Sequence, residues 1–145
     1  MAEQQNIQVV RDMFNAFKRG DIPALMRSVA DEVVWEVPGP PHVPYAGRRF
    51  GCREVEKFFE LVERNAEFNT FEPREFIAQA DKVVAVGHYS GRAKPTGREL
   101  VSDFSMVFDM RQGKVTHLRQ YFDTANMAAA FDTGESKLAG LPANP

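Results

Sequence analysis

The chain has 145 residues, 43% hydrophobic and 26% charged, which is typical of one soluble globular domain. Eighteen basic and 20 acidic residues leave a net charge of −2, so neither nucleic acid nor an anionic membrane is an expected partner. No apolar run reaches the ~20 residues that a membrane span needs, and the polar N-terminus does not resemble a secretory signal. The single cysteine leaves no partner for an internal disulfide. We therefore expect a cytoplasmic enzyme or binding protein.

The first half of the chain is predicted to form three helices and one strand. The first helix carries an apolar stripe at helical spacing: Ile7, Val10, Phe14 and Phe17. Gly20 ends this helix, and Asp21 caps a short second helix. The buried side of the second helix is predicted to be Leu25, Met26 and Val29. A strand over 33–37 stops at the Pro-Gly-Pro-Pro of 38–41, and a third helix follows with Val55, Phe58, Phe59 and Val62 on its buried face.

The second half of the chain is predicted to form a meander of antiparallel hairpins. Turn residues at 80–82, 94–97 and 111–113 separate runs rich in Val, Phe and Tyr, which gives strands of roughly 74–80, 83–92, 99–109 and 114–123. Residues 124–131 add a short helix. We therefore expect one α+β domain over 1–131, with helices covering one face of a curved antiparallel sheet, and a flexible tail over 132–145.

Pairing the predicted strands assigns side chains to two faces of the sheet. A turn near Pro95 pairs Tyr89 with Ser102 and His88 with Asp103. The next hairpin is predicted to pair Phe104 with Gln120 and Asp103 with Tyr121. The first face then carries Ala85, Gly87, Tyr89, Ser102, Phe104, Met106, Phe108, Thr116, Leu118, Gln120 and Phe122. This apolar face is predicted to line a pocket beneath the helices, where Gly87 and Gly91 leave room for a ligand or a sharp bend.

The opposite face carries the more reactive side chains: His88, Asp103, Ser105, His117, Arg119 and Tyr121. A carboxylate beside an imidazole is an arrangement that makes a general base. Polar and aromatic rows of this kind also stabilise sheets and dimer interfaces, and the interface is the favoured interpretation. A one-residue bulge in the strand over 99–109 would instead turn Asp103 and Ser105 into the pocket.

The order of these elements resembles the nuclear transport factor two-like superfamily, whose cystatin-like α+β barrel is a cone-shaped sheet covered by helices. The resemblance lies in "FNAFKRGDIPALMRSVADEVVWEVPG" (14–39), "YAGRRFGCREVEKFF" (45–59) and "GKVTHLRQYFDTA" (113–125), and it is strongest for SnoaL-like polyketide cyclases. It implies the fold and a small-molecule pocket, with isomerase, cyclase or epoxide hydrolase activities among the relatives.

The catalytic residues of two relatives do not transfer to this chain. Ketosteroid isomerases place a carboxylate where Val37 stands and a tyrosine near Met13. The Arg and two Asp of limonene epoxide hydrolase correspond to Gly87, Tyr89 and Gln120. Neither mechanism is therefore inherited.

The remaining candidates form a ligand-binding set and a catalytic set. The ligand-binding candidates are Trp35, Tyr45, Tyr89, Ser102, Phe104, Met106, Leu118 and Gln120. The catalytic candidates are His88, Asp103 and His42, the last in a Pro-rich loop at the pocket mouth. A core aromatic and a ligand-stacking wall are equally favoured interpretations of Trp35. Loop anchoring is the favoured role of Tyr45, and an exposed position without a function is the favoured interpretation of His42.

Two functions follow from these candidates. One is a SnoaL-like acid–base enzyme, of the isomerase, cyclase or epoxide hydrolase type, that needs no cofactor and acts on an apolar, oxygen-bearing compound. The other is a non-catalytic binding or accessory protein that has lost the catalytic carboxylates. The spacing of the three histidines offers no metal site. We expect a homodimer that forms through the outer face of the sheet.

Overall fold

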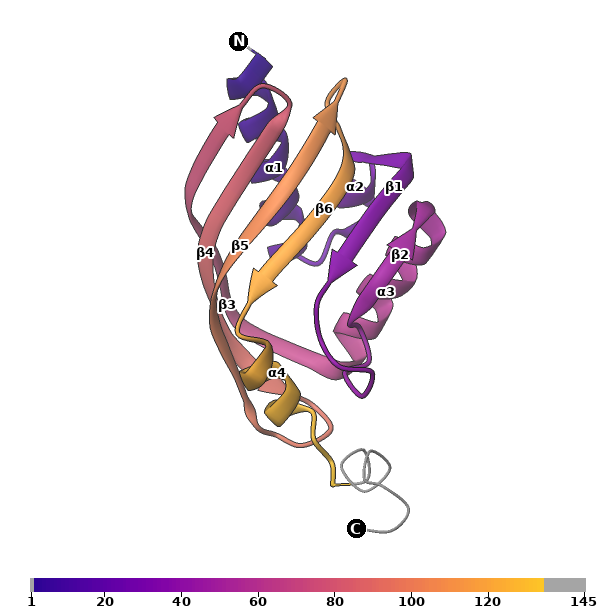
Figure 1. The fold of residues 1–145 in the computed structure, drawn as a ribbon, viewed down its shortest axis with the longest axis vertical. Helices are drawn as coiled ribbons and strands as arrows, with labels where there is room; N and C mark the ends of the chain where they lie inside the picture. Colours follow the sequence, from indigo (N-terminus) through magenta and orange to yellow (C-terminus); the bar gives the residue numbers. More distant parts are fainter. Residues whose placement is uncertain (1, 135–145) are drawn as a thin grey trace.

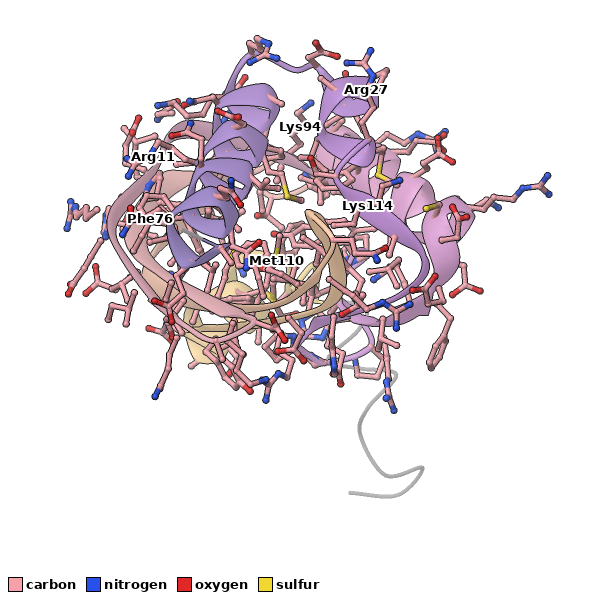
Figure 2. All side chains as sticks on the ribbon, turned by 90° about the horizontal axis from the view of Figure 1, so that it is seen from above. Arg11, Arg27, Phe76, Lys94, Met110 and Lys114 are labelled. Carbon is pink, nitrogen blue, oxygen red and sulfur yellow. The ribbon has the colours of Figure 1, made fainter. Side chains whose placement is uncertain are left out.

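The computed structural model describes residues 2–134, so most of the tail predicted from residue 132 lies outside the described residues. Three helices, α1 (Ala2–Lys18), α2 (Ile22–Met26) and α3 (Gly51–Asn65), lie on the concave side of one curved sheet (Figures 1 and 2). A fourth helix, α4 (Thr124–Ala130), follows the last strand. The α+β fold with helices covering a curved sheet, as predicted, is confirmed.

The sheet has six strands, in the order β2-β1-β6-β5-β4-β3. Their bounds are β1 (Val29–Val37), β2 (Gly47–Phe50), β3 (Ala66–Gln79), β4 (Lys82–Ala93), β5 (Glu99–Arg111) and β6 (Lys114–Phe122). β1 runs parallel to β6, whereas all other neighbours are antiparallel. The sheet is therefore mixed and open, with one parallel pair of strands where the sequence predicted antiparallel neighbours.

The second helix is shorter than predicted, and Val29 belongs to β1. The Asp21 carboxylate accepts a hydrogen bond from the backbone N–H of Ala24 at 3.1 Å, and Pro23 lies in the first turn, so the helix begins as predicted. It ends after one turn, and the buried Val29 and Ala30 begin the extended run that leads into Val33. β-branched residues favour this extended backbone.

The register between β4 and β5 is the predicted one, with Tyr89 opposite Ser102 and His88 opposite Asp103. The predicted register between β5 and β6 was wrong by two residues, because Tyr121 lies opposite Ser105 and not Asp103. A shift of two leaves every side chain on its predicted face, since side chains alternate with a period of two. The proposed row of His88, Asp103 and Tyr121 is nevertheless broken.

The hairpin of β5 and β6 does contain an irregularity, but it lies away from Asp103. The register shifts between Asp109 and Met110, where Met110 pairs with Val115 and Asp109 pairs with His117. Thr116 is thus left out of the ladder, and its hydroxyl donates to the Asp109 carbonyl at 3.2 Å. Phe108 pairs with Leu118, and Phe104 pairs with Phe122 where Gln120 was predicted.

Two glycines of β4 allow the sheet to bend. A side chain at Gly87 would overlap the backbone oxygen of Glu72, and one at Gly91 would overlap the backbone oxygen of Glu67. Both glycines lie beside register irregularities in β3. Gly87 lies beside the one between Pro73 and Glu75, and Gly91 lies beside the one between Phe68 and Thr70. Their missing side chains therefore admit the neighbouring backbone.

Helix α1 is held against this bent part of the sheet by aromatic contacts. The Phe14 ring stacks on Phe104 with centroids 5.9 Å apart, and the Arg11 guanidinium lies 4.6 Å from the centre of the Phe76 ring (Figure 2). The concave face and the helices thus form one core and enclose a cavity.

Candidate ligand pocket

The inner cavity lies between helices α1 and α3 and the concave face of the sheet. Its volume is about 80 Å³, and its walls include Phe14, Phe58, Trp35 and Leu118. Six of the eight predicted ligand-binding residues line it: Trp35, Tyr45, Tyr89, Met106, Leu118 and Gln120. Phe104 is buried in the core beside Phe14, outside this lining.

Trp35 supplies an unpaired hydrogen-bond donor. Alternation along β1 places its side chain on the concave face, where it packs against Phe58 and Phe59 with centroids 5.9 and 5.6 Å away. Trp35 is only 3% exposed, and its indole N–H has no acceptor among the described residues. Because a buried donor without an acceptor is costly, a ligand oxygen at this point would restore a missing interaction.

Tyr89 supplies a second polar group on the same face. Its ring stacks on Phe71 with centroids 5.5 Å apart, and Ser102 lies opposite it on β5. Burial raises the pKa of Tyr89 to about 12, since a phenolate is poorly solvated inside the protein. Tyr89 therefore stays protonated near neutral pH and can act as a hydrogen-bond donor.

Tyr45 approaches the cavity from the loop before β2. Its ring meets Phe58 and Phe131 edge-on, at 6.1 and 5.5 Å. Burial raises the pKa of the Tyr45 phenol well above its ordinary value, and the nearby Tyr89 phenol adds to the increase. The cavity thus holds two protonated phenols, and Gln120 of β6 adds a carboxamide.

Ser102 lies beside the cavity and is occupied by backbone partners. Its hydroxyl donates to the Asp103 carbonyl at 2.5 Å and accepts from the Asp123 N–H at 2.9 Å. The second of these bonds joins β5 to the start of α4. Ser102 therefore lies opposite Tyr89 in the sheet, with its hydroxyl bonded to backbone groups.

The three predicted catalytic residues lie outside the inner cavity. His88 and Asp103 form a pair on the outer face, with His88 Nδ1 2.9 Å from Asp103 Oδ1, and the Asp103 side chain is 83% exposed. His42 Nε2 lies 2.9 Å from the carbonyl oxygen of Ala128, so this histidine ties its loop to α4. No Asp, Glu, His, Lys or Arg is among the described residues that line the cavity.

Sequence reasoning missed a charged cluster on the outer face. His117 Nε2 lies 2.5 Å from Glu36 Oε2, and His117 Nδ1 lies 3.9 Å from Asp109 Oδ2. The hydrogen bond to His117 is the main reason that the pKa of Glu36 is lowered. The cluster depends on the parallel pairing of β1 with β6, which side-chain periodicity alone does not predict.

Sequence reasoning also missed the pocket residues that the helices supply, such as Phe58, Phe59 and Met127. The apolar stripes of α1 and α3 were the available signal, because the buried side of each helix faces the sheet.

Within residues 2–134 no cluster of three or more acidic, histidine or cysteine side chains could hold a metal ion. None of the described helices is long and apolar enough to cross a bilayer.

Solved structures place the chain in the nuclear transport factor two-like superfamily. An NTF2-like protein from Burkholderia xenovorans LB400 is 35% identical, with a TM-score of 0.82 over 90% of this chain and 98% of that one. An NTF2-like protein from Burkholderia pseudomallei K96243 is 28% identical, with a TM-score of 0.78 over 88% and 97%. TerC, co-crystallised with polyporic acid, is 25% identical, with a TM-score of 0.76 over 89% and 99%.

The family itself follows from the sequence match. The model of the SnoaL-like domain matches residues 10–118, which is most of the chain. The protein belongs to the SnoaL-like domain family. None of the curated proteins compared with it matches significantly.

Proposed function

We propose that the inner cavity binds a neutral, largely apolar small molecule through an oxygen that accepts hydrogen bonds. The observation that carries this proposal is the unpaired Trp35 N–H in the same lining as two protonated tyrosines, where the described residues include no charged side chain. Burying an unpaired ion costs several kcal/mol, whereas a neutral carbonyl or ether oxygen is readily desolvated. The protein then acts as a binding or accessory protein.

Among residues 2–134, none that lines the cavity is a carboxylate, histidine or lysine that could act as a general base, which supports binding over acid–base catalysis. A general base must reach the proton that it removes, and His88, Asp103 and His42 all lie outside the cavity lining. The two tyrosines cannot act as bases near pH 7 because their pKa values are raised by burial. The co-crystallisation of TerC with polyporic acid supports a small-molecule role for this fold.

A second candidate is an isomerase, cyclase or epoxide hydrolase of the SnoaL-like type. The proximity of Tyr45 and Tyr89 favours it, because two neutral donors aimed at one oxygen can stabilise charge that develops there. Such an enzyme would need its substrate or a water molecule to carry the proton. Turnover of an enolisable ketone that is lost in Tyr89→Phe would favour this candidate.

Three isosteric probes test the binding proposal: acetophenone, cumene and benzoate. Acetophenone carries a neutral acceptor, cumene carries no acceptor, and benzoate carries a charge on the same frame. Calorimetry should give the lowest Kd for acetophenone, with cumene about 2–10-fold weaker for the loss of one hydrogen bond and benzoate weaker still. Tightest binding of benzoate would refute the proposal.

A further inference from the structure

A second depression, here called the outer groove, lies against the inner cavity. It has a volume of about 370 Å³ and lies between the C-terminal ends of α1 and α3 and the first half of β3. The two spaces share five residues, here called the aromatic wall: Phe17, Phe59, Val62, Phe68 and Phe71. One layer of side chains therefore separates the inner cavity from the outer groove.

Three residues of the aromatic wall are partly exposed rings. Phe17, Phe68 and Phe71 are only half-buried, and their centroids lie 5.1–6.4 Å apart in tilted or edge-on contacts. The register shift between Phe68 and Thr70 leaves Asn69 outside the regular ladder. Rotation of a partly exposed side chain is fast and breaks no backbone hydrogen bond.

The small size of the inner cavity favours an extension of this kind. Its volume of about 80 Å³ is well below the roughly 300–1,000 Å³ of typical ligand pockets. The outer groove lies directly behind the wall and is the larger of the two spaces. Displacing one ring of the wall would join them into a site of ordinary size.

The rim of the outer groove determines which end of a ligand would lie there. Lys18 Nζ pairs with Glu72 at 2.9 Å, and Glu63, Asn69 and Thr70 complete the polar part of the lining. One cation and two carboxylates give this rim a negative balance, so a carboxylate on the ligand would be repelled. Hydroxyl groups fit, because they can accept from Lys18 or Asn69 and donate to Glu72.

We propose that the inner cavity and the outer groove together hold one elongated ligand. Its apolar ring system lies in the inner cavity, and its neutral, hydroxyl-bearing end passes the aromatic wall and lies in the outer groove. This assignment rests on the proposed function, because it assumes that the inner cavity binds a neutral ring. It adds the ligand's length, its amphipathic character and a second set of contacts.

Probes that share one head group test the proposal directly: acetophenone, 4-acetylphenyl β-glucoside and 4-acetylphenyl cyclohexyl ether. The glucoside should bind at least tenfold more tightly than acetophenone, and also more tightly than the ether, whose tail has the same size without hydroxyls. A glucoside that binds no more tightly than acetophenone would overturn the proposal.

Variants at the groove show where the tail lies. Asn69→Trp fills the groove from an exposed position and should weaken the glucoside about tenfold, with acetophenone unchanged within twofold. Gln79→Trp is the matched control, since Gln79 is exposed on β3 and lines neither space.

Lys18→Met provides a second test through an exposed side chain, and it should weaken the binding of the glucoside several-fold. If both groove variants bind the glucoside like wild type, the proposal is wrong.

The two proposals fail in different ways. If acetophenone binds and Tyr89→Phe weakens it, but the glucoside gains nothing, the groove assignment fails and the proposed function stands. If neither acetophenone nor the glucoside binds, both fail.

Discussion

Tyr89 is the residue whose contribution to binding can be isolated most cleanly. Tyr89→Phe keeps the ring that stacks on Phe71 and removes only the hydroxyl. We expect acetophenone to bind about 2–10-fold more weakly, which corresponds to a net loss of about 0.5–1.5 kcal/mol. Titration calorimetry measures this change, and a thermal melt shows whether the fold is retained.

Asp103→Asn is the control for Tyr89→Phe. The Asp103 carboxylate lies on the outer face beside His88, so this change should leave acetophenone affinity as it is. Equal weakening by both variants would mean that Asp103 acts on the cavity and that the assignment of faces is wrong.

The tyrosine pKa values predict how binding depends on pH. The pKa of Tyr89 is raised to about 12, above its ordinary value of about 10, so the donor stays protonated over the neutral range. Acetophenone affinity should therefore be constant from pH 6 to pH 9. The raised pKa also means that any stability from burying the neutral phenol is lost only as the pH rises above about 10. A step in affinity within this range would contradict the assignment of Tyr89 as a protonated donor.

At the scale of elements, the parallel junction of β1 and β6 is where the outer-face charges are concentrated. Glu36 on β1 accepts from His117 on β6, and this bond lowers the pKa of Glu36 below 4.5. A carboxyl group whose pKa is lower in the folded than in the unfolded state stabilises the fold at pH values above the unfolded-state pKa. This stabilisation disappears as the pH falls through the folded-state pKa. The pair is partly exposed, so its contribution is at most about 1 kcal/mol.

The variant Glu36→Gln tests this contribution by denaturant unfolding at several pH values. Wild type should be the more stable protein at pH 7, and the difference should shrink below about pH 4.5 as Glu36 becomes protonated. Glu32→Gln, which removes an exposed pair with Arg111, is the control. A difference that does not change with pH would show that the charge of Glu36 does not matter.

The elements also show which structural features can be read from a sequence. Alternation in β4 and β5, with a tight turn between them, was enough to pair Tyr89 with Ser102 and to separate the two faces. The β5–β6 register was missed because Thr116 leaves the ladder just after the turn, a local choice that no composition signal marks. β2 was missed because it is a short, mostly exposed edge strand in a loop.

At the scale of the whole molecule, the predicted pocket face was useful because it did not depend on the exact register. An error of two residues in β6 kept Leu118 and Gln120 on the concave side, and both line the inner cavity. The parallel pairing of β1 with β6, and with it the Glu36–His117 pair, required a long-range contact. Such contacts depend on three-dimensional packing and leave no periodic pattern in the chain.

The outer face of the sheet supports the proposal of a homodimer. Ile77 and Tyr121 are 53% and 50% exposed, and Val84 and Val107 pair with each other between them on the same face. An apolar group of this kind is a candidate interface. Sedimentation at micromolar concentration should give about twice the chain mass of 16.4 kDa.

Tyr121→Asp should shift this equilibrium toward monomer, since it places a charge among the apolar side chains. Gln5→Asp, on the exposed part of α1, should not. A wild-type species that sediments at 16.4 kDa under all conditions would exclude the dimer.

The central claim is that a neutral ligand oxygen accepts a hydrogen bond inside the inner cavity, and the Trp35 indole N–H reports it directly. Trp35 is the single tryptophan of the chain, so a ¹⁵N-labelled sample gives one indole N–H resonance. Saturation with acetophenone should move this proton downfield, as expected when a donor gains an acceptor, whereas cumene should leave it nearly in place. Acetophenone that binds without moving the Trp35 resonance would contradict the account.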